Sequence, residues 1–319
     1  MAAFARLVSG VWTTTTHVGT SISDTWEWGP GRHSLSMLSE GTSSSGTPWR
    51  SIEVLYWHPG RGQFRRLGIN PFNRSVAEGT VAFAGNSAES HIDMHQTTGL
   101  RRLRSRWTFV GPDAYRDELF EDSGSGVYEP LASWDRIRMA SQPPQGTPDT
   151  PHPRPSRYID RLEPFLGLWE LADFRVAIEY VPHADAVRVR VRESGAAGEA
   201  GLLLDAYAFH HTGTQELRTI ALSRRGGVYE GTLVPVEDGS LQFALKGYEG
   251  PGIVELGVRL DLLEGGMVRY RLCSVAGAKA TPIEEGVGLR SNELHYPLIK
   301  LTPTARVEWV TQDESRPPQ

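Results

Sequence analysis

The sequence has little cysteine, no excess of basic residues and no long apolar runs. Cys273 is the single cysteine of 319 residues, which excludes an internal disulfide and a cysteine-rich zinc site and favours a reducing compartment. Thirty-three basic residues against 38 acidic ones give a formal charge of -5, so we expect no nucleic-acid partner. No uninterrupted run of about 18 apolar residues occurs, and Met1 to Gly10 has no apolar core of a signal peptide. We therefore expect a cytoplasmic protein with no membrane partner.

Helical periodicity is also scarce, and short period-two alternation takes its place. From Val187 to Arg192 valines alternate with arginines, so one face of this segment is apolar and the other charged. Similar runs lie at 52–57, 216–222, 229–235, 241–246, 254–263 and 267–273. Turn residues separate the runs, which predicts consecutive hairpins. An antiparallel meander with one apolar face loses its edges by closing into a barrel, and only Ala2–Val8 and Arg157–Leu166 are expected to form short helices.

A proline-rich segment divides the chain. Six prolines lie between Met139 and Tyr158, and they prevent both a helix and a strand ladder while keeping the backbone extended. We place a first domain at 1–140, a linker at 141–157 and a second domain at 158–310.

The two domains repeat one another. Gly10-Val11-Trp12 recurs as Gly167-Leu168-Trp169, and Glu78-Gly79-Thr80 recurs as Glu230-Gly231-Thr232. A repeat of domain length indicates a duplication and is too long for a solenoid or propeller unit. Both G-x-W tryptophans are interpreted as structural plugs. The sequence thus predicts an all-β protein with two tandem antiparallel β-barrels joined by the proline-rich linker.

Three motifs carry a resemblance to a known family. They are the opening Leu7–Trp12 (LVSGVW), the turn-rich centre Tyr56–Gly60 (YWHPG) and the acidic strand end Asp117–Glu121 (DELFE). Together they resemble the calycin superfamily, and within it the bacterial lipocalin-like domains of unknown function, over residues 5–138 and 158–310. The resemblance implies a closed barrel with an internal cavity for a small, mostly apolar ligand, and it implies no reaction. It also implies an arginine of the last strand stacked on the G-x-W tryptophan, for which Arg136 or Arg138 is the candidate.

Tryptophan is unevenly distributed. Seven of the nine lie in the first half, at positions 12, 26, 28, 49, 57, 107 and 134. Trp26 and Trp28 share a strand face by their spacing, and with Tyr56 and Trp107 they would give a cavity wall flat contact area at low entropy cost. The alternative is that these rings simply fill the core of a small barrel.

The sharpest cluster of reactive side chains is His91-Ile92-Asp93-Met94-His95. On a strand both imidazoles and the carboxylate share one face, with about 6.5–7 Å between successive members. The two imidazoles, roughly 13 Å apart, are too distant to hold one metal together. A His-Asp acid–base pair is one possibility. The length of the following loop decides the face, and an even-length loop places the three side chains opposite arginines on a charged outer face.

An odd-length loop instead places these three side chains inside the barrel. Their inner neighbours would then be Leu103, Ser105 and Trp107, joined by Asp117. Aligning the repeats from Glu78 without gaps matches His91 and Asp93 with Phe243 and Leu245, which should face inward. This alignment favours the inner face, and both arrangements stay open.

We expect the first barrel to bind a small hydrophobic or aromatic molecule, and the second barrel to be mainly structural. The ligand-contacting residues would be Trp26, Trp28, Tyr56, His95, Ser105, Trp107 and Asp117. The alternative is a cofactor-independent cyclase, isomerase or hydrolase in which His91 and Asp93 transfer protons inside the first barrel. A purely structural or protein-interaction role is a third hypothesis. No metal or cofactor is expected, and His58, His210 and His211 are interpreted as loop residues.

Overall fold

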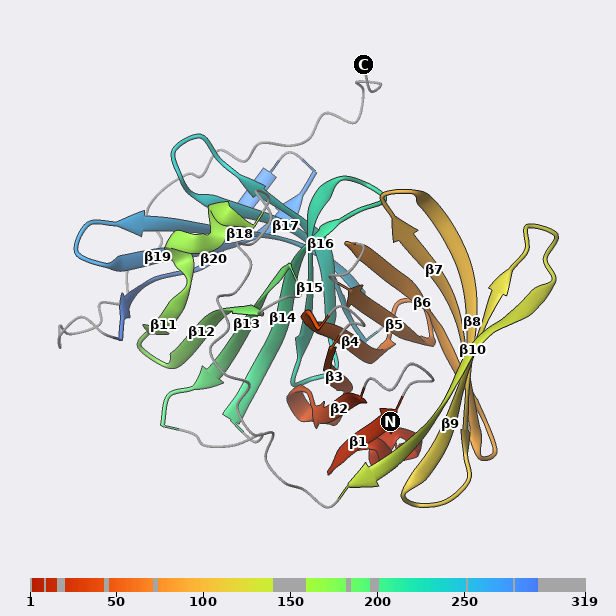
Figure 1. Cartoon of the computed structure of the whole chain (residues 1–319). Coiled ribbons are helices and arrows are strands. Elements are labelled where there is room, and N and C mark those ends of the chain that lie inside the picture. Colours follow the sequence, from red (N-terminus) through yellow and green to blue (C-terminus); the bar gives the residue numbers. More distant parts are fainter. Residues whose placement is uncertain are drawn as a thin grey trace.

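The computed structural model describes residues 2–8, 10–15, 21–42, 46–70, 74–139, 159–181, 185–195, 201–250, 252–277 and 279–291. Within these residues the chain forms twenty strands and three short 3-10 helices. None of the helices described there is long and apolar enough to cross a membrane. Figure 1 shows the strands gathered into two barrels that lie side by side.

The first barrel contains ten antiparallel strands that hydrogen-bond in sequence order and close through the pairing of the first strand with the tenth. The strands are β1 (Val11–Thr15), β2 (Ser21–Trp28), β3 (Ser34–Thr42), β4 (Pro48–His58), β5 (Gln63–Asn70), β6 (Ser75–Ala84), β7 (Ser87–Gln96), β8 (Gly99–Phe109), β9 (Ala114–Asp122) and β10 (Tyr128–Met139). Helix η1 (Ala2–Leu7) precedes them, and η2 (Pro30–Arg32) joins β2 to β3.

The second barrel has the same order and closes through the pairing of β11 with β20. Its strands are β11 (Gly167–Glu170), β12 (Phe174–Val181), β13 (Ala186–Glu193), β14 (Leu202–His211), β15 (Glu216–Ser223), β16 (Val228–Pro235), β17 (Leu241–Glu249), β18 (Gly252–Leu263), β19 (Met267–Ala276) and β20 (Lys279–Arg290). Helix η3 (Asp160–Phe165) leads into β11.

The predicted all-β fold of two tandem barrels is confirmed, and the barrels fit a lipocalin-like fold. Each strand pairs with its neighbours in sequence, as expected where alternating segments are separated by tight turns such as Gly85-Asn86. Both predicted helices are present as short 3-10 segments. The predicted linker, 141–157, lies outside the described residues, as does the part of the second domain beyond residue 291.

The two G-x-W tryptophans plug their barrels in the same way. Trp12 and Trp169 are fully buried, and each indole donates to a carbonyl oxygen of the preceding helix at 2.8 Å. An arginine of the last strand lies over each ring with its guanidinium carbon 4.6 Å from the ring centroid, Arg138 in the first barrel and Arg290 in the second. Of the two candidates, Arg138 is thus the stacking arginine, because Arg136 pairs with Asp24 in the lumen.

The barrels pack against one another through apolar outer faces. On β4 alternate residues face opposite ways, so that Leu55 contacts the lumen while Val54 and Tyr56 contact the second barrel. The shared cluster consists of Ile52, Val54, Tyr56, Leu67, Ile69 and Val76 from the first barrel and Ala186, Tyr207, Phe209, Ile220, Leu222 and Val228 from the second. Burial of this cluster holds the two barrels together.

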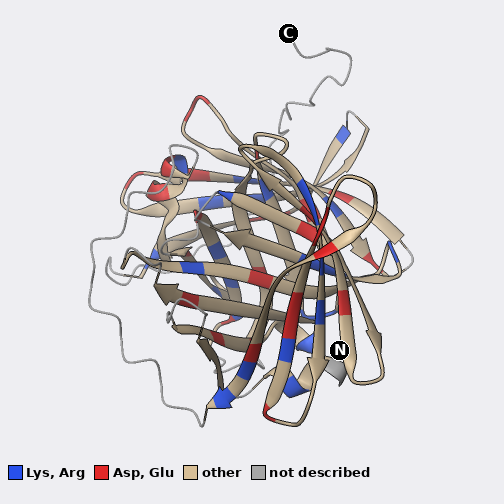
Figure 2. Cartoon of the chain, turned by 45° about the vertical axis from the view of Figure 1, so that its right-hand side comes forward, with Lys and Arg blue, Asp and Glu red and all other residues tan. Residues whose placement is uncertain are grey.

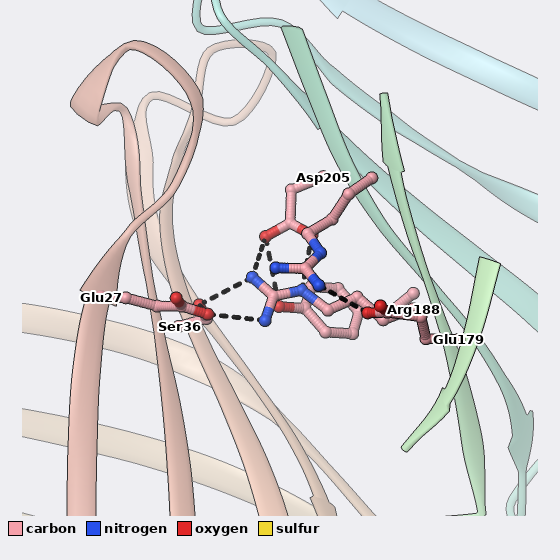
Figure 3. A network of polar contacts seen from close by, with 7 residues as sticks. Glu27, Ser36, Glu179, Arg188 and Asp205 are labelled. Atoms are coloured by element: carbon pink, nitrogen blue, oxygen red, sulfur yellow. Dashed lines mark hydrogen bonds and ion pairs between the residues drawn. The ribbon is translucent and has the colours of Figure 1, made fainter. Parts of the chain in front are cut away.

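A polar network crosses the same interface (Figure 3). Arg188 on β13 donates twice to Asp205 of its own barrel at 2.8 Å. It also reaches Glu27 of the first barrel at 2.6 Å and Ser36 at 3.4 Å. Ser36 and Arg188 occupy corresponding positions on β3 and β13, so corresponding strands of the two barrels meet here as in a symmetric dimer.

Candidate functional site

The lumen of the second barrel contains an apolar cavity of about 400 Å³. It extends from the plug residues Phe165 and Trp169 through the middle of the barrel. Its wall consists almost entirely of valine, leucine, isoleucine, alanine and aromatic side chains from β11 to β19. The alternation of apolar and charged residues on strands such as β13 explains this wall, because every second side chain points inward.

Few polar groups reach this cavity. Two tyrosines in its wall direct their hydroxyl groups to glutamates: Tyr270 donates to Glu284 at 2.5 Å, and Tyr229 donates to Glu249. Thr219 also lines the cavity, and its hydroxyl group is itself buried without a hydrogen-bond partner among the described residues. A buried unsatisfied hydroxyl is costly.

The lumen of the first barrel is filled instead. Trp26 and Trp107 meet edge to face, with 6.0 Å between ring centroids. Arg66 lies with its guanidinium carbon 5.5 Å from the Trp107 ring centroid, and it donates to the buried Glu53 at 2.5 Å. Such stacked and paired groups occupy the space that is open in the second barrel.

A second ion pair and a further carboxyl group complete the first lumen. Arg136 pairs with the buried Asp24, while Asp117 accepts a hydrogen bond from Ser105 at 3.1 Å. With the pair described above, three carboxyl groups face two guanidinium groups. Burial raises the pKa of Asp117, and it raises the pKa of the other two carboxyl groups as well. The excess carboxyl group therefore favours uptake of a proton.

The strand pairings show which residue of the second lumen stands at the position of each residue of the first lumen. The matched pairs are Asp24 with Val176, Trp26 with Ile178, Glu53 with Ala206, Arg66 with Thr219, Trp107 with Leu260 and Asp117 with Tyr270. Four of the six replacements put a smaller side chain in place of a larger one, and four put an uncharged side chain in place of a charged one. The second lumen is hollow for this reason.

The structure brings together only part of the predicted ligand set. Trp26, Ser105, Trp107 and Asp117 lie in the first lumen, as described above, and Trp28 packs against the same aromatic cluster. Tyr56 does not. Its ring belongs to the cluster between the barrels, because it stands on the opposite face of β4 from the lumen residues. Its hydroxyl donates to Glu230 of the second barrel at 3.1 Å.

Of the two arrangements left open for His91, Asp93 and His95, the structure shows the one on the outer face. The loop after β7 is the two-residue turn Thr97-Thr98, an even length, which sets His91 opposite Arg104 and Asp93 opposite Arg102. The side chains of His91 and Asp93 are each 59% exposed on the outer face, where Figure 2 shows acidic and basic residues interspersed along the strands. Proton transfer by this pair inside the barrel is therefore not supported.

The gap-free alignment failed because of one residue. In the first barrel Thr80 pairs with His91, whereas its counterpart Thr232 pairs with Ala244, so the β16–β17 hairpin is one residue longer. A shift of one residue moves every side chain of a strand to the other face. His91 therefore corresponds to Ala244, and Phe243, the residue matched by the gap-free alignment, lines the second cavity.

Two buried histidines, His58 on β4 and His211 on β14, form matching corners of the interface. In both, the amide three residues further on donates to Nδ1, at 3.2 Å in the first barrel and 3.1 Å in the second. Nε2 then faces a glutamate of the other barrel, Glu230 at 3.5 Å from His58 and Glu78 at 3.4 Å from His211. Both histidines were expected in loops, but each ends a strand and is buried against the partner barrel.

A ring from the opposite barrel covers each of these histidines. Tyr248 lies on His58 with 4.5 Å between ring centroids, and His95 lies on His211 at 4.7 Å. The glycine two residues after each histidine gives the ring room, since a Cβ there would lie 2.3 Å from Tyr248 or 2.5 Å from His95. His95, predicted as a ligand contact inside the first barrel, is thus an interface residue. The repeated H-x-G at 58–60 and 211–213 was the sequence signal for both corners.

Comparison with protein-family models finds no matching family. A search of curated proteins finds no match either.

Proposed function

We propose that the protein binds a small, mostly apolar molecule in the lumen of its second barrel. The observation that carries this proposal is the apolar cavity of about 400 Å³. Its volume lies in the range of about 300–1,000 Å³ that is usual for ligand sites, which are lined mainly by apolar side chains and a few polar groups. The sequence favoured the first barrel for its aromatic residues, but Trp26 and Trp107 fill that lumen and Tyr56 lies outside it.

The chemistry of the wall narrows the class of ligand. An ionised group would lose its hydration without gaining a partner in this wall, so a charged ligand is disfavoured. In this proposal Thr219, whose hydroxyl has no hydrogen-bond partner among the described residues, rotates that hydroxyl toward one polar atom of the ligand. We therefore favour an uncharged molecule with an apolar body and a single carbonyl, ether or hydroxyl group. The calycin resemblance supports the same kind of ligand and remains part of this proposal.

The test uses N-phenyl-1-naphthylamine, an uncharged probe whose fluorescence rises in apolar sites. Wild-type full-length chain should bind about one equivalent. Ile178→Trp introduces the ring that the first barrel carries at the matching position, and it should weaken probe binding at least about tenfold by filling the cavity. Val258→Phe, a smaller change in the cavity wall, serves the same purpose if the tryptophan variant fails to fold.

The matched control is Trp26→Phe, which alters the first lumen alone and should leave probe affinity unchanged. If Trp26→Phe lost probe binding while Ile178→Trp bound the probe fully, the binding site would lie in the first barrel. Absence of probe binding by the wild-type chain would contradict the proposal.

For location, the composition supports a reducing compartment, the cytoplasm. The single cysteine, Cys273, is buried in β19. Because one cysteine cannot form a disulfide within the chain, folding needs no oxidising environment. That nucleic acid and membranes are not partners stays a prediction from charge and hydropathy.

A further inference from the structure

Among the described residues, one group of side chains has the composition of a transition-metal site. Glu78 on β6, His95 on β7 and His211 on β14 each offer one ligand atom, and these three atoms lie within 4.8 Å of one another. Two imidazoles and one carboxylate are a frequent ligand set for zinc and related divalent ions. The three residues come from both barrels, so the group exists only because the barrels pack together.

The carboxylate of Glu78 is positioned as a metal ligand would be. Its Oε2 lies 3.4 Å from His211 Nε2, while its Oε1 lies 3.3 Å from Arg218. Ligand atoms about 2.0–2.1 Å from a tetrahedral metal are roughly 3.3–3.4 Å apart, so the first pair stands at the required spacing. Arg218 holds the second oxygen and so orients the carboxylate, as outer contacts commonly do for metal ligands.

The matching corner of the interface lacks such a group. There His58 faces Glu230 as His211 faces Glu78, but the covering ring is Tyr248. A phenol is a poor partner for zinc beside imidazole, thiolate and carboxylate. The chain therefore contains two nearly equal corners that differ in one potential ligand, His95 against Tyr248.

A pocket of about 250 Å³ adjoins the group on the outer face of the first barrel. Glu78 and His95 both line it, and the charged or polar side chains of Arg65, His91, Asp93 and Tyr128 lie in the same wall. Three protein ligands leave the fourth position of a tetrahedral ion to water or a small ligand. An ion held by Glu78 and His95 would border this polar pocket, which is separate from the apolar lumen of the second barrel.

We propose that Glu78, His95 and His211 bind a divalent transition metal of the zinc class between the two barrels. In the structure the amide of Thr214 donates to His211 Nδ1, so Nε2 carries the proton directed at Glu78. When the metal takes Nε2, the imidazole stays neutral by carrying its proton on Nδ1 instead, so Nδ1 no longer accepts from the Thr214 amide, and binding costs this hydrogen bond and shifts the turn that follows β14. This site is independent of the apolar cavity and of the ligand proposed for it.

The test titrates the full-length chain with Co²⁺ and then displaces it with Zn²⁺. We expect one equivalent of Co²⁺ with the intense visible absorption of a tetrahedral ion and its loss on addition of Zn²⁺. His95→Tyr copies the residue of the matching corner and so preserves a packing that the protein already uses. It should weaken metal binding by at least about 100-fold, because even indirect partners of a metal are worth 10–100-fold. Glu78→Gln should also weaken metal binding.

The matched control is Glu230→Gln, which makes the same chemical change in the corner without a third ligand. It should leave Co²⁺ affinity unchanged. Unaltered binding by His95→Tyr would overturn the proposal, since the metal would then occupy other residues. Absence of stoichiometric binding by the wild-type chain would also overturn it.

Discussion

The two barrels share strand order, plug and closure, yet their lumens differ completely. In the first, Arg66 and Glu53 form a buried pair beside Trp107. In the second, Thr219 and Ala206 stand at the matching positions and line an apolar cavity. The comparison teaches that closure of the barrel depends on the strand meander and the plug, whereas the lumen is free to be solid or hollow.

The difference also implies that the two barrels have different roles, the filled one contributing mainly to stability and the hollow one leaving room for a ligand. A close-packed interior with paired charges tolerates few changes, because each lost partner leaves a buried polar group. A hollow interior forgoes packing energy, which a bound ligand would restore. Four predictions follow this contrast, from the largest expected effect to the smallest.

Arg66→Met should destabilise the protein most, by about 3–5 kcal/mol, because it leaves the carboxylate of Glu53 buried without its partner. Urea unfolding followed by tryptophan fluorescence measures this loss. The control is Arg190→Met, which breaks an ion pair with Glu179 whose side chains are 28% and 51% exposed, and this change should cost at most about 1 kcal/mol. Equal losses in the two variants would show that the first lumen is not a dry interior with buried charges.

Removing the stacked arginine should cost the same in either barrel. Arg138→Ala and Arg290→Ala each lose a guanidinium at 4.6 Å from the plug tryptophan and its bonds to carbonyl oxygens. We expect a loss of about 2–3 kcal/mol in both, from the cation–π contact and the charged hydrogen bonds. Thermal unfolding compares the two variants, and a loss in only one would show that the plugs are not equivalent.

Small-to-large substitutions should separate a solid lumen from a hollow one. Ala88→Val enlarges a residue packed in the first aromatic cluster, and overpacking should cost about 1–2 kcal/mol. Ala206→Val extends into the second cavity and should leave the free energy of unfolding unchanged or raise it. Denaturant midpoints at constant slope report both values. A comparable loss in Ala206→Val would indicate that the second lumen is also tightly packed.

The smallest effect concerns pH. Burial raises the pKa of Asp117, so the folded protein binds this proton more readily than the unfolded chain does. The resulting stabilisation is complete below the ordinary aspartate pKa and is lost as pH rises through the raised value. Wild type should therefore gain stability relative to Asp117→Asn as pH falls from the raised pKa toward the ordinary aspartate value of about 3.9. A constant difference between the two proteins would contradict the raised pKa.

Several features of the site were within reach of the sequence, and others were not. Trp26 and Trp107 were predicted to lie together inside the first barrel, and the structure brings their rings together there. Trp12 and Trp169 were identified as plugs from the repeated G-x-W. The cavity of the second barrel was missed because its wall contains only ordinary apolar residues. The same residues would also form a close-packed core, so the sequence does not distinguish a filled lumen from a hollow one.

The sequence by itself determined the strands, the turns, the duplication and the plugs, since each depends on residues close together in the chain. Only the tertiary structure decided the rest. The β16–β17 hairpin is one residue longer than the β6–β7 hairpin, so Phe243 faces inward whereas His91, its partner in the gap-free alignment, faces outward. The packing of the barrels buried Tyr56 and His58 and brought Glu78, His95 and His211 together. These outcomes depend on register and on contacts between distant segments, where a change of one residue reverses the result.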